Sequence, residues 1–81
     1  MQKAHDLVMF LVSHLVEDVD SVKLEHEEDA GILRFNLKVA DDDMKYIIGR
    51  RGKTIRSLQS ALRVLGAKQQ QRIFLNLIDN K

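Results

Sequence analysis

The sequence has 81 residues and a mass of 9.3 kDa, which predicts one domain over residues 1–81. Its composition is 44% hydrophobic and 31% charged with no cysteine, which excludes a disordered chain, a disulfide framework and a thiolate zinc site. The formal net charge is only +1, but residues 1–43 sum to −7 and residues 44–81 sum to +8. This asymmetry indicates either a polyanionic partner on the basic half or ion pairs between the two halves.

Hydropathy argues against a membrane protein. The longest apolar run, Leu7 to Val12, has six residues, whereas a membrane-spanning helix needs about 20. The first residues also lack the pattern of a signal peptide. Together with the absence of cysteine, this predicts a cytoplasmic protein without membrane contact.

The first predicted element is a helix over residues 2–16, which contains neither glycine nor proline. One apolar stripe at helical spacing is expected to face the core: Ala4, Leu7, Val8, Leu11 and Leu15. Met9, Val12 and Val16 form a neighbouring apolar face, which widens the apolar arc beyond what one core contact requires. That second face is either a further core contact or a partner surface.

Two strands and a turn follow. Val22, Leu24 and His26 alternate with charged residues, which predicts a half-buried strand, and the residues from 33 to 39 show the same period of two. Asp29-Ala30-Gly31 between them favours a turn, so the two strands should form an antiparallel hairpin. On its exposed face we expect cross-strand charge pairs rather than a binding patch.

The second half predicts two helices and a strand. We expect Asp41, Asp42 and Asp43 to cap a short helix over residues 44–48 and not to bind a metal, because consecutive carboxylates diverge in direction. A longer helix over 53–65 should end at Gly66, followed by a strand over 73–78. The resulting order, α-β-β-α-α-β, predicts a two-layer α+β fold with a three-stranded mixed sheet and three helices on one face. The second and third strands should be parallel.

The segment from Tyr46 to Ile55 carries the strongest functional signal. Gly49 and Gly52 permit backbone angles that are closed to other residues, and they bring two helices together within four residues. The second helix begins near Lys53, so its free N–H groups can meet an anion, and Arg50, Arg51, Lys53 and Arg56 add full charges. This combination predicts a phosphate-binding turn.

Catalytic and metal-binding alternatives are not supported. Gly52-Lys53-Thr54 matches the end of a nucleotide-binding P-loop, but that motif requires glycine five positions earlier, where this chain has Ile47. The three histidines lack metal-ligand spacing, and no serine has a recognisable nucleophile context. We therefore predict no catalytic residue, no metal site and no cofactor.

The run Ile47-Ile48-Gly49-Arg50-Arg51-Gly52-Lys53-Thr54-Ile55 resembles the Gly-x-x-Gly loop of a KH domain. The element order resembles the type II KH arrangement, and a chain of this size is similar to the small bacterial KH proteins of the KhpA type. That resemblance implies single-stranded RNA binding, pairing as a homodimer or with a longer multidomain KH protein, and links to RNA chaperoning, post-transcriptional regulation and cell shape. The residues expected to bind RNA are Ile47, Ile48, Gly49, Arg50, Arg51, Gly52, Lys53, Thr54 and Arg56.

The resemblance also implies a site for the bases. They should lie in an apolar groove bounded by Ile47, Ile48, Ile55 and the last strand. All three phenylalanines lie outside the loop, so we expect little stacking of bases on aromatic rings.

A second class of function stays open: a protein-interaction module that uses the KH fold as a dimerisation scaffold. The longer helix carries two small residues, Ser57 and Ala61, and the apolar Val64 beside its core stripe. We expect this face to form the dimer interface, with the first helix as the second choice. The two arginines between the glycines favour RNA over an acidic protein as the ligand of the loop.

Overall fold

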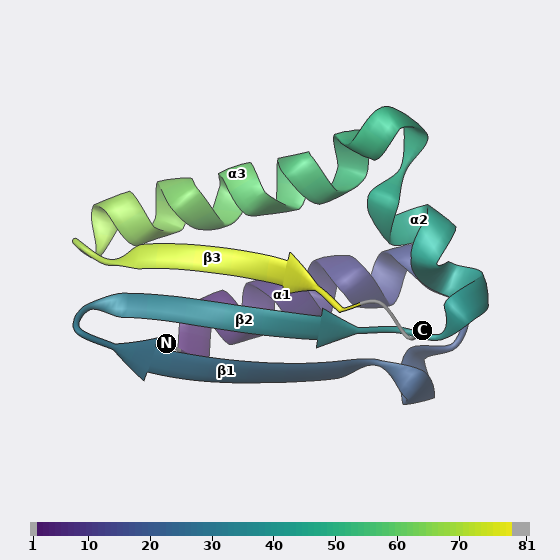
Figure 1. The fold of residues 1–81 in the computed structure, drawn as a ribbon, viewed down its shortest axis with the longest axis horizontal. Helices are drawn as coiled ribbons and strands as arrows, with labels where there is room; N and C mark the ends of the chain where they lie inside the picture. The colour runs from purple at the N-terminus through teal and green to yellow at the C-terminus, as the bar shows by residue number, and fades with distance from the viewer. Residues whose placement is uncertain (1, 79–81) are drawn as a thin grey trace.

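The computed structural model describes residues 2–78 of the chain, and its elements follow the predicted order (Figure 1). The helices and strands are α1 (Gln2–Leu15), β1 (Lys23–Asp29), β2 (Ile32–Lys38), α2 (Met44–Ile48), α3 (Lys53–Lys68) and β3 (Arg72–Leu77). Single turns of 3-10 helix cover Val19–Ser21, Asp41–Asp43 and Arg50–Gly52. The predicted α-β-β-α-α-β fold is therefore confirmed.

The three strands form one sheet in the order β1-β2-β3. β1 pairs with β2 in antiparallel fashion, and β2 pairs with β3 in parallel. The parallel pairing follows from the crossover through α2 and α3, which brings the chain back to the end of the sheet where β2 begins, so that β3 runs in the same direction as β2. Both pairings match the sequence-based expectation, and β3 is left with one free edge.

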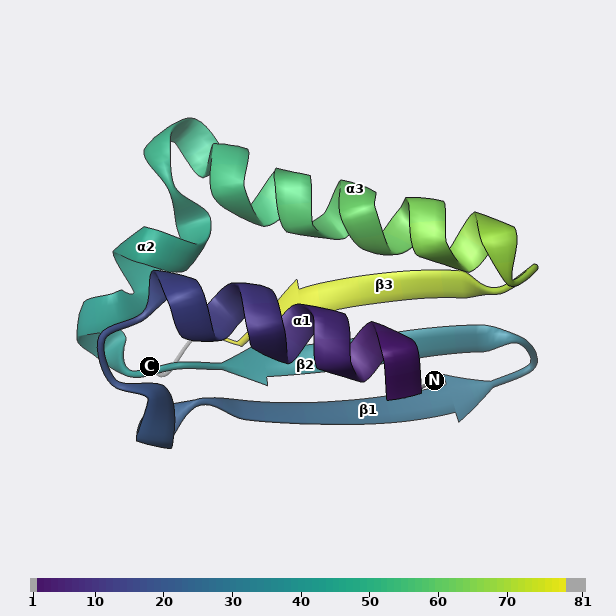
Figure 2. The same ribbon diagram turned by 180° about the vertical axis from the view of Figure 1, so that it is seen from behind.

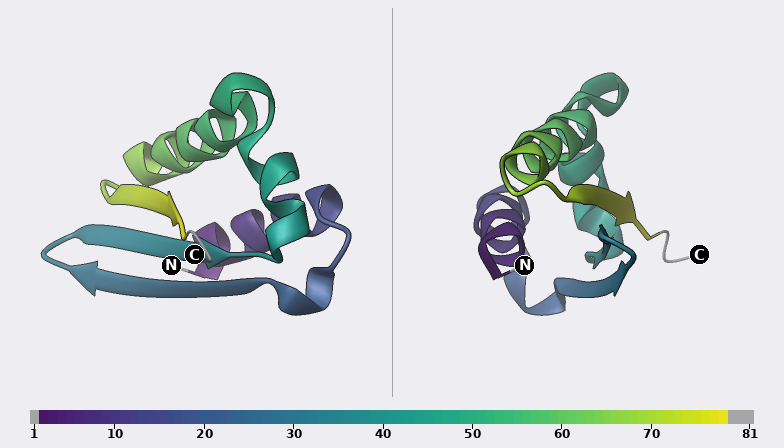
Figure 3. Two further views of the ribbon diagram at one scale, coloured as in Figure 1. Left: turned by 45° about the vertical axis from the view of Figure 1, so that its right-hand side comes forward. Right: turned by 90° about the vertical axis from the view of Figure 1, so that its left-hand side faces the viewer.

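The helices cover one face of the sheet and leave the other face open. Figure 2 shows α1 lying across the strands, and the end-on view in Figure 3 places α1 and α3 on the same side of the sheet. The core lies between these layers and includes Phe35, Leu33 and Leu37 from β2, each fully buried. Because side chains alternate along a strand, the intervening residues Arg34 and Lys38 are exposed on the open face.

The buried face of α1 differs from the predicted one. Ala4, Val8, Val12 and Val16, at spacings of four residues, are buried, whereas Leu7, Leu11 and Leu15 are only half-buried. Val12 and Val16 are thus core residues, so of the two alternatives for this face the further core contact is correct for them and the partner surface is not. The exposed apolar residue of α1 is Phe10, with 62% of its surface accessible.

The predicted end of α3 was wrong. α3 does not end at Gly66 but continues to Lys68, with Gly66 buried inside the helix. A side chain at position 66 would overlap the Gln71 carbonyl oxygen and lie 3.1 Å from Ile73 Cγ1, so this glycine allows α3 to pack closely on the start of β3. On the open sheet face the expected cross-strand charge pairs are found in part: Glu27 lies opposite Arg34, although the two form no ion pair, whereas Lys23 lies opposite Lys38.

The aspartate triplet has a role other than the predicted helix cap. Asp41–Asp43 forms a 3-10 turn, and no side chain caps α2. Asp43 is 2% exposed, and its two carboxylate oxygens accept the backbone N–H groups of Glu17 (3.1 Å) and Asp18 (3.0 Å). This carboxylate therefore fixes the connection between α1 and β1 to the start of α2.

Within residues 2–78, none of the helices combines the length and the apolar character that crossing a lipid bilayer requires.

Candidate nucleic-acid interface

The turn between α2 and α3 has a backbone that depends on its glycines. Gly49 adopts φ 73° and ψ −179°, a region that is essentially restricted to glycine. Gly52 adopts φ 74° and ψ 16°, and the N–H of Gly52 donates to the Gly49 carbonyl oxygen at 3.3 Å. Arg51 is also left-handed, at φ 56° and ψ 30°, a conformation that costs a non-glycine residue about 1 kcal/mol or more.

The two glycines also permit close contacts. A Cβ at Gly49 would overlap the side chain of Thr54 and approach the Thr54 backbone nitrogen to 2.9 Å. A Cβ at Gly52 would lie 3.2 Å from Nη1 of Arg56, so the Arg56 guanidinium lies against the turn. Thr54 and Arg56, both expected site residues, are therefore part of the same compact structure as the loop.

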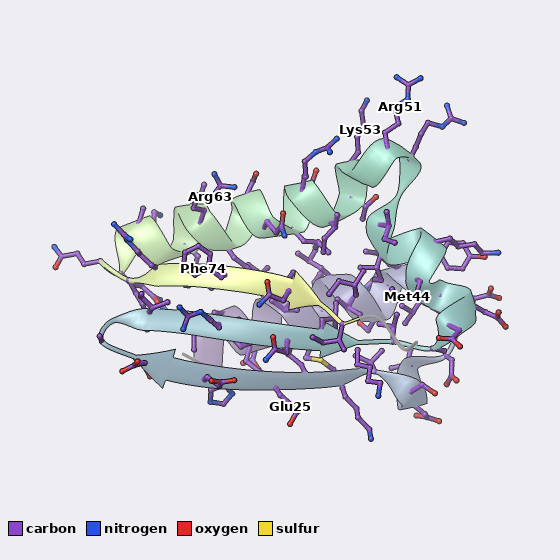
Figure 4. All side chains as sticks on the ribbon, in the orientation of Figure 1. Glu25, Met44, Arg51, Lys53, Arg63 and Phe74 are labelled. Carbon is purple, nitrogen blue, oxygen red and sulfur yellow. The ribbon has the colours of Figure 1, made fainter. Side chains whose placement is uncertain are left out.

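Three cations project from this turn into solvent. Arg50, Arg51 and Lys53 are exposed, and Figure 4 shows Arg51 and Lys53 pointing away from the body of the molecule. None of the three forms an ion pair within residues 2–78, and residues 44–78 contain no Asp or Glu. No side chain caps α3; the backbone N–H groups of Gly52 and Lys53 donate to the carbonyl oxygens of Gly49 and Arg50, so the positive end of the helix lies beside these charges with its first N–H groups bonded within the turn. The turn is thus a strongly electropositive projection without a local counter-charge.

Apolar residues hold the turn on the core, but they are not equally accessible. Ile47 is fully buried, which limits this residue to anchoring the loop and leaves it no surface for a ligand. Ile48 is 38% exposed, and Ile55 is half-buried against the core. Ile48 is therefore the apolar side chain of the loop region that is most available to a base.

A groove with a volume of about 560 Å³ lies between α3 and β3, and Ile47, Ile48 and Ile55, the expected boundary residues, do not line it. It is lined by Gln59, Arg63, Ala67, Gln71, Arg72, Ile73, Phe74, Leu75 and Asn76. Across its floor, Nε2 of Gln59 donates to the Leu75 carbonyl oxygen at 3.1 Å, which fixes α3 to the free edge of β3.

An aromatic ring, that of Phe74, lines this groove. Phe74 on β3 is 48% exposed. Phe74 alternates with the buried Ile73 and Leu75, so it lies on the open face of the sheet, and Figure 4 shows it at the edge of β3 that is next to α3, below Arg63. About half of the residue is accessible, so a base could stack on Phe74. The position of Phe74 outside the loop did not indicate this.

The geometry can be compared with known proteins. The family model described as KhpA/KhpB, KH domain, matches residues 5–77, which include the loop, both flanking helices and the whole sheet. The chain belongs to the KhpA/KhpB family of KH domains. The resemblance that the Gly-x-x-Gly segment indicated is confirmed.

The chain is similar to several proteins named RNA-binding protein KhpA. It is 34% identical over 73 residues to the one from Halalkalibacterium halodurans, covering 90% of this chain and 96% of that protein. It is 35% identical over 74 residues to the one from Borreliella burgdorferi, covering 91% and 90% respectively. The one from Listeria monocytogenes is 27% identical over 74 residues, covering 91% and 97%.

The expected dimer face of this KhpA/KhpB-type domain lies outside the groove. Ser57, Ala61 and Val64 are exposed on α3, and Val64 has 64% of its surface accessible. Their spacing of four and three residues places them on one side of the helix, whereas Gln59 and Arg63 line the groove on another. A partner on the first side would leave the groove open.

Two supports of the loop were not recognised in the sequence. Asp43 holds the start of α2 through the N–H groups of Glu17 and Asp18. Tyr46, within α2, donates its hydroxyl to Oε1 of Glu17 at 3.1 Å. These contacts join residues at least 25 positions apart, so no local pattern indicates them. The position and burial of the Asp43 carboxylate could be found only from the fold. Among the described residues, no group of three His, Cys, Asp or Glu side chains could hold a metal ion.

Proposed function

We propose that this chain binds single-stranded RNA by placing the strand's phosphates against the turn from Gly49 to Gly52. The observation that carries the proposal is the exposed, uncompensated charge of Arg50, Arg51 and Lys53 at the uncapped N-terminus of α3. Phosphate oxygens accept hydrogen bonds from such side chains, and the positive end of a helix attracts their charge. The similar proteins from other organisms, named RNA-binding protein KhpA, support the same ligand.

The expected residues have different roles in the proposed contact with RNA. Gly49 and Gly52 let the RNA backbone approach the protein backbone, while the basic side chains neutralise phosphates. Thr54 and Ile47 hold the turn in shape, and Ile48 offers exposed apolar surface next to the loop. The function that we propose for such binding is RNA chaperoning or post-transcriptional regulation in the cytoplasm.

Single-stranded RNA should bind more tightly than a duplex of the same sequence. The turn is only four residues long, and the adjoining groove can accept bases only if they are unpaired. If about three phosphates are neutralised, the slope of log K against log salt concentration should be roughly −2, from about −0.7 per contact. Fluorescence anisotropy over a salt series measures both quantities. Tighter binding to the duplex than to its separated strands would refute the proposed mode of binding.

We further propose that two chains associate through the α3 face formed by Ser57, Ala61 and Val64. A chain of this size buries only about 60% of its unfolded surface, so covering exposed apolar residues adds stability. Ser57 and Ala61 are small enough for two helices to approach closely, and the exposed Val64 would be buried. A longer, multidomain KH protein could occupy the same face as an alternative partner.

Ala61→Phe is expected to convert the dimer to a folded monomer, because the larger ring prevents close helix contact. Sedimentation velocity over a concentration series measures this change. Ser21→Phe is the control, since Ser21 is exposed in the turn before β1, outside α3, and should leave the dimer intact. A wild-type chain that is monomeric at all concentrations would contradict self-association, and a folded, dimeric Ala61→Phe variant would place the interface elsewhere.

A further inference from the structure

The acidic half of the chain is not neutralised by the basic half. Residues 1–43 sum to −7 and residues 44–81 sum to +8, and ion pairs between the halves would have balanced them. In the part of the chain that the structure describes, the one ion pair joins His5 and Asp6, which both belong to the acidic half. The uncompensated charge is densest in residues 17–29, which contain seven carboxylates and one lysine.

Strand β1 lies within this acidic stretch and has one unpaired edge. The sheet order β1-β2-β3 pairs β1 with β2 alone, and Figure 1 shows no further strand beside its outer edge. In an antiparallel edge strand, every second residue turns its N–H and C=O groups away from the sheet. Within residues 2–78, no side chain forms a hydrogen bond with the backbone of β1, whereas at the other border of the sheet Gln59 donates to the Leu75 carbonyl oxygen.

Charge is the feature that guards this edge. β1 has seven residues without proline or glycine, and its register with β2 is unbroken from Lys23 to Asp29, so it contains no bulge. Short strands, prolines, bulges and charges are the usual protection of an exposed edge. If β1 of a second copy paired antiparallel about His26, Glu25 of each copy would lie opposite Glu27 of the other and repel it. The edge therefore rejects its own copy and attracts a basic strand.

The two faces of β1 define the side chains that such a strand must carry. Glu25 and Glu27 are exposed on the open face, and Figure 4 shows Glu25 pointing outward past the border of the sheet. Neither carboxylate forms an ion pair in the described chain. Between them in the sequence pattern, Leu24 lies on the helix-covered face, where it is half-buried against the core. An added strand would place alternate side chains beside these two kinds of neighbour.

We propose that the free edge of β1 binds an extended basic segment of another protein by strand addition. Lysine or arginine side chains of the segment lie beside Glu25 and Glu27, and an apolar side chain lies beside Leu24. In this mode of recognition the backbone hydrogen bonds supply affinity and the alternate side chains supply specificity. The inference goes beyond the proposed RNA function and does not rest on it, because β1 and β3 form opposite borders of the sheet.

The probe for this edge is a capped peptide of alternating lysine and valine with seven residues, the length of β1. In an NMR titration of the ¹⁵N-labelled chain, the largest amide shifts should lie between Lys23 and Asp29. An alternating lysine–glycine peptide carries the same charge but forms strands poorly, and it should bind at least about fivefold more weakly. The absence of shifts in β1 at millimolar lysine–valine peptide would overturn the proposal.

N-methylation of the peptide tests the backbone pairing. One version carries N-methyl groups on the lysine residues and the other carries them on the valine residues. Because only every second residue of an added strand donates to β1, one version should lose binding and the other should retain it. Equal affinities of the two versions would contradict strand addition.

The charge component has its own variant. Glu25→Gln with Glu27→Gln should weaken binding of the lysine–valine peptide roughly 2- to 30-fold at low salt, the range for two exposed ion pairs. Asp41→Asn with Asp42→Asn removes the same charge from the exposed turn before α2, and should change the affinity less than about twofold. Equal losses in the two variants would overturn the site, because the peptide would then respond to net charge alone.

Discussion

Replacing Arg50 and Arg51 with aspartate is expected to abolish RNA binding while the chain stays folded. Both side chains are exposed and make no ion pair in the described chain, so the exchange disturbs no packing. It reverses two charges at the point where the proposed phosphates lie, which replaces attraction with repulsion. We expect affinity for a single strand to fall at least about a hundredfold, measured by gel shift alongside circular dichroism.

A matched variant separates the loop from general electrostatics. Lys23→Asp with Lys38→Asp makes the same change in net charge on the open face of the sheet, where these two exposed lysines lie opposite each other. This control should retain most of its affinity. Equal losses in the two variants would mean that RNA responds to net charge alone, and an Arg50→Asp, Arg51→Asp chain that binds normally would refute the role of the loop.

Replacing Asp43 with alanine is expected to destabilise the fold by about 2 to 4 kcal/mol. The change leaves two partly buried N–H groups, those of Glu17 and Asp18, without their acceptor, and each unmet group costs about 1 to 3 kcal/mol. In a domain of this size, such a loss lowers the melting temperature by about 10 °C or more. Thermal unfolding followed by circular dichroism measures it.

The neighbouring aspartate supplies the control. Asp42 is exposed in the same turn and accepts no hydrogen bond from a distant backbone group in the described chain, so Asp42→Ala should change stability by less than about 0.5 kcal/mol. Asp43→Asn keeps one acceptor oxygen and should fall between alanine and the wild type. Equal stability of the Asp42 and Asp43 alanine variants would contradict the structural role of Asp43.

The order of elements and the pairing of strands could be predicted because both depend on local periodicity. Alternation in β2 and the helical spacing in α3 indicate which residues are buried, and the crossover rule then gives the parallel pairing of β2 with β3. The Gly-Arg-Arg-Gly turn could also be found, since its residue types have a local conformational reason.

The errors arose where tertiary contacts decide the outcome. The sequence of α1 is apolar on several sides, so its spacing could not show that Val12 and Val16, rather than Leu11 and Leu15, are buried. Gly66 has the residue type of a helix end, but close packing against the connection to β3 requires the glycine inside the helix. β3 is apolar on both faces, and only the sheet shows that Phe74 lies on the open one.

The most direct test of the central claim is an NMR titration of the ¹⁵N-labelled chain with a single-stranded decamer of uridine. Binding at the turn predicts that the largest backbone amide shifts lie in the range from Gly49 to Lys53, where the exposed cations Arg50, Arg51 and Lys53 lie. Shifts confined to α1 and the β1–β2 hairpin, or no shifts at saturating RNA, would contradict the account.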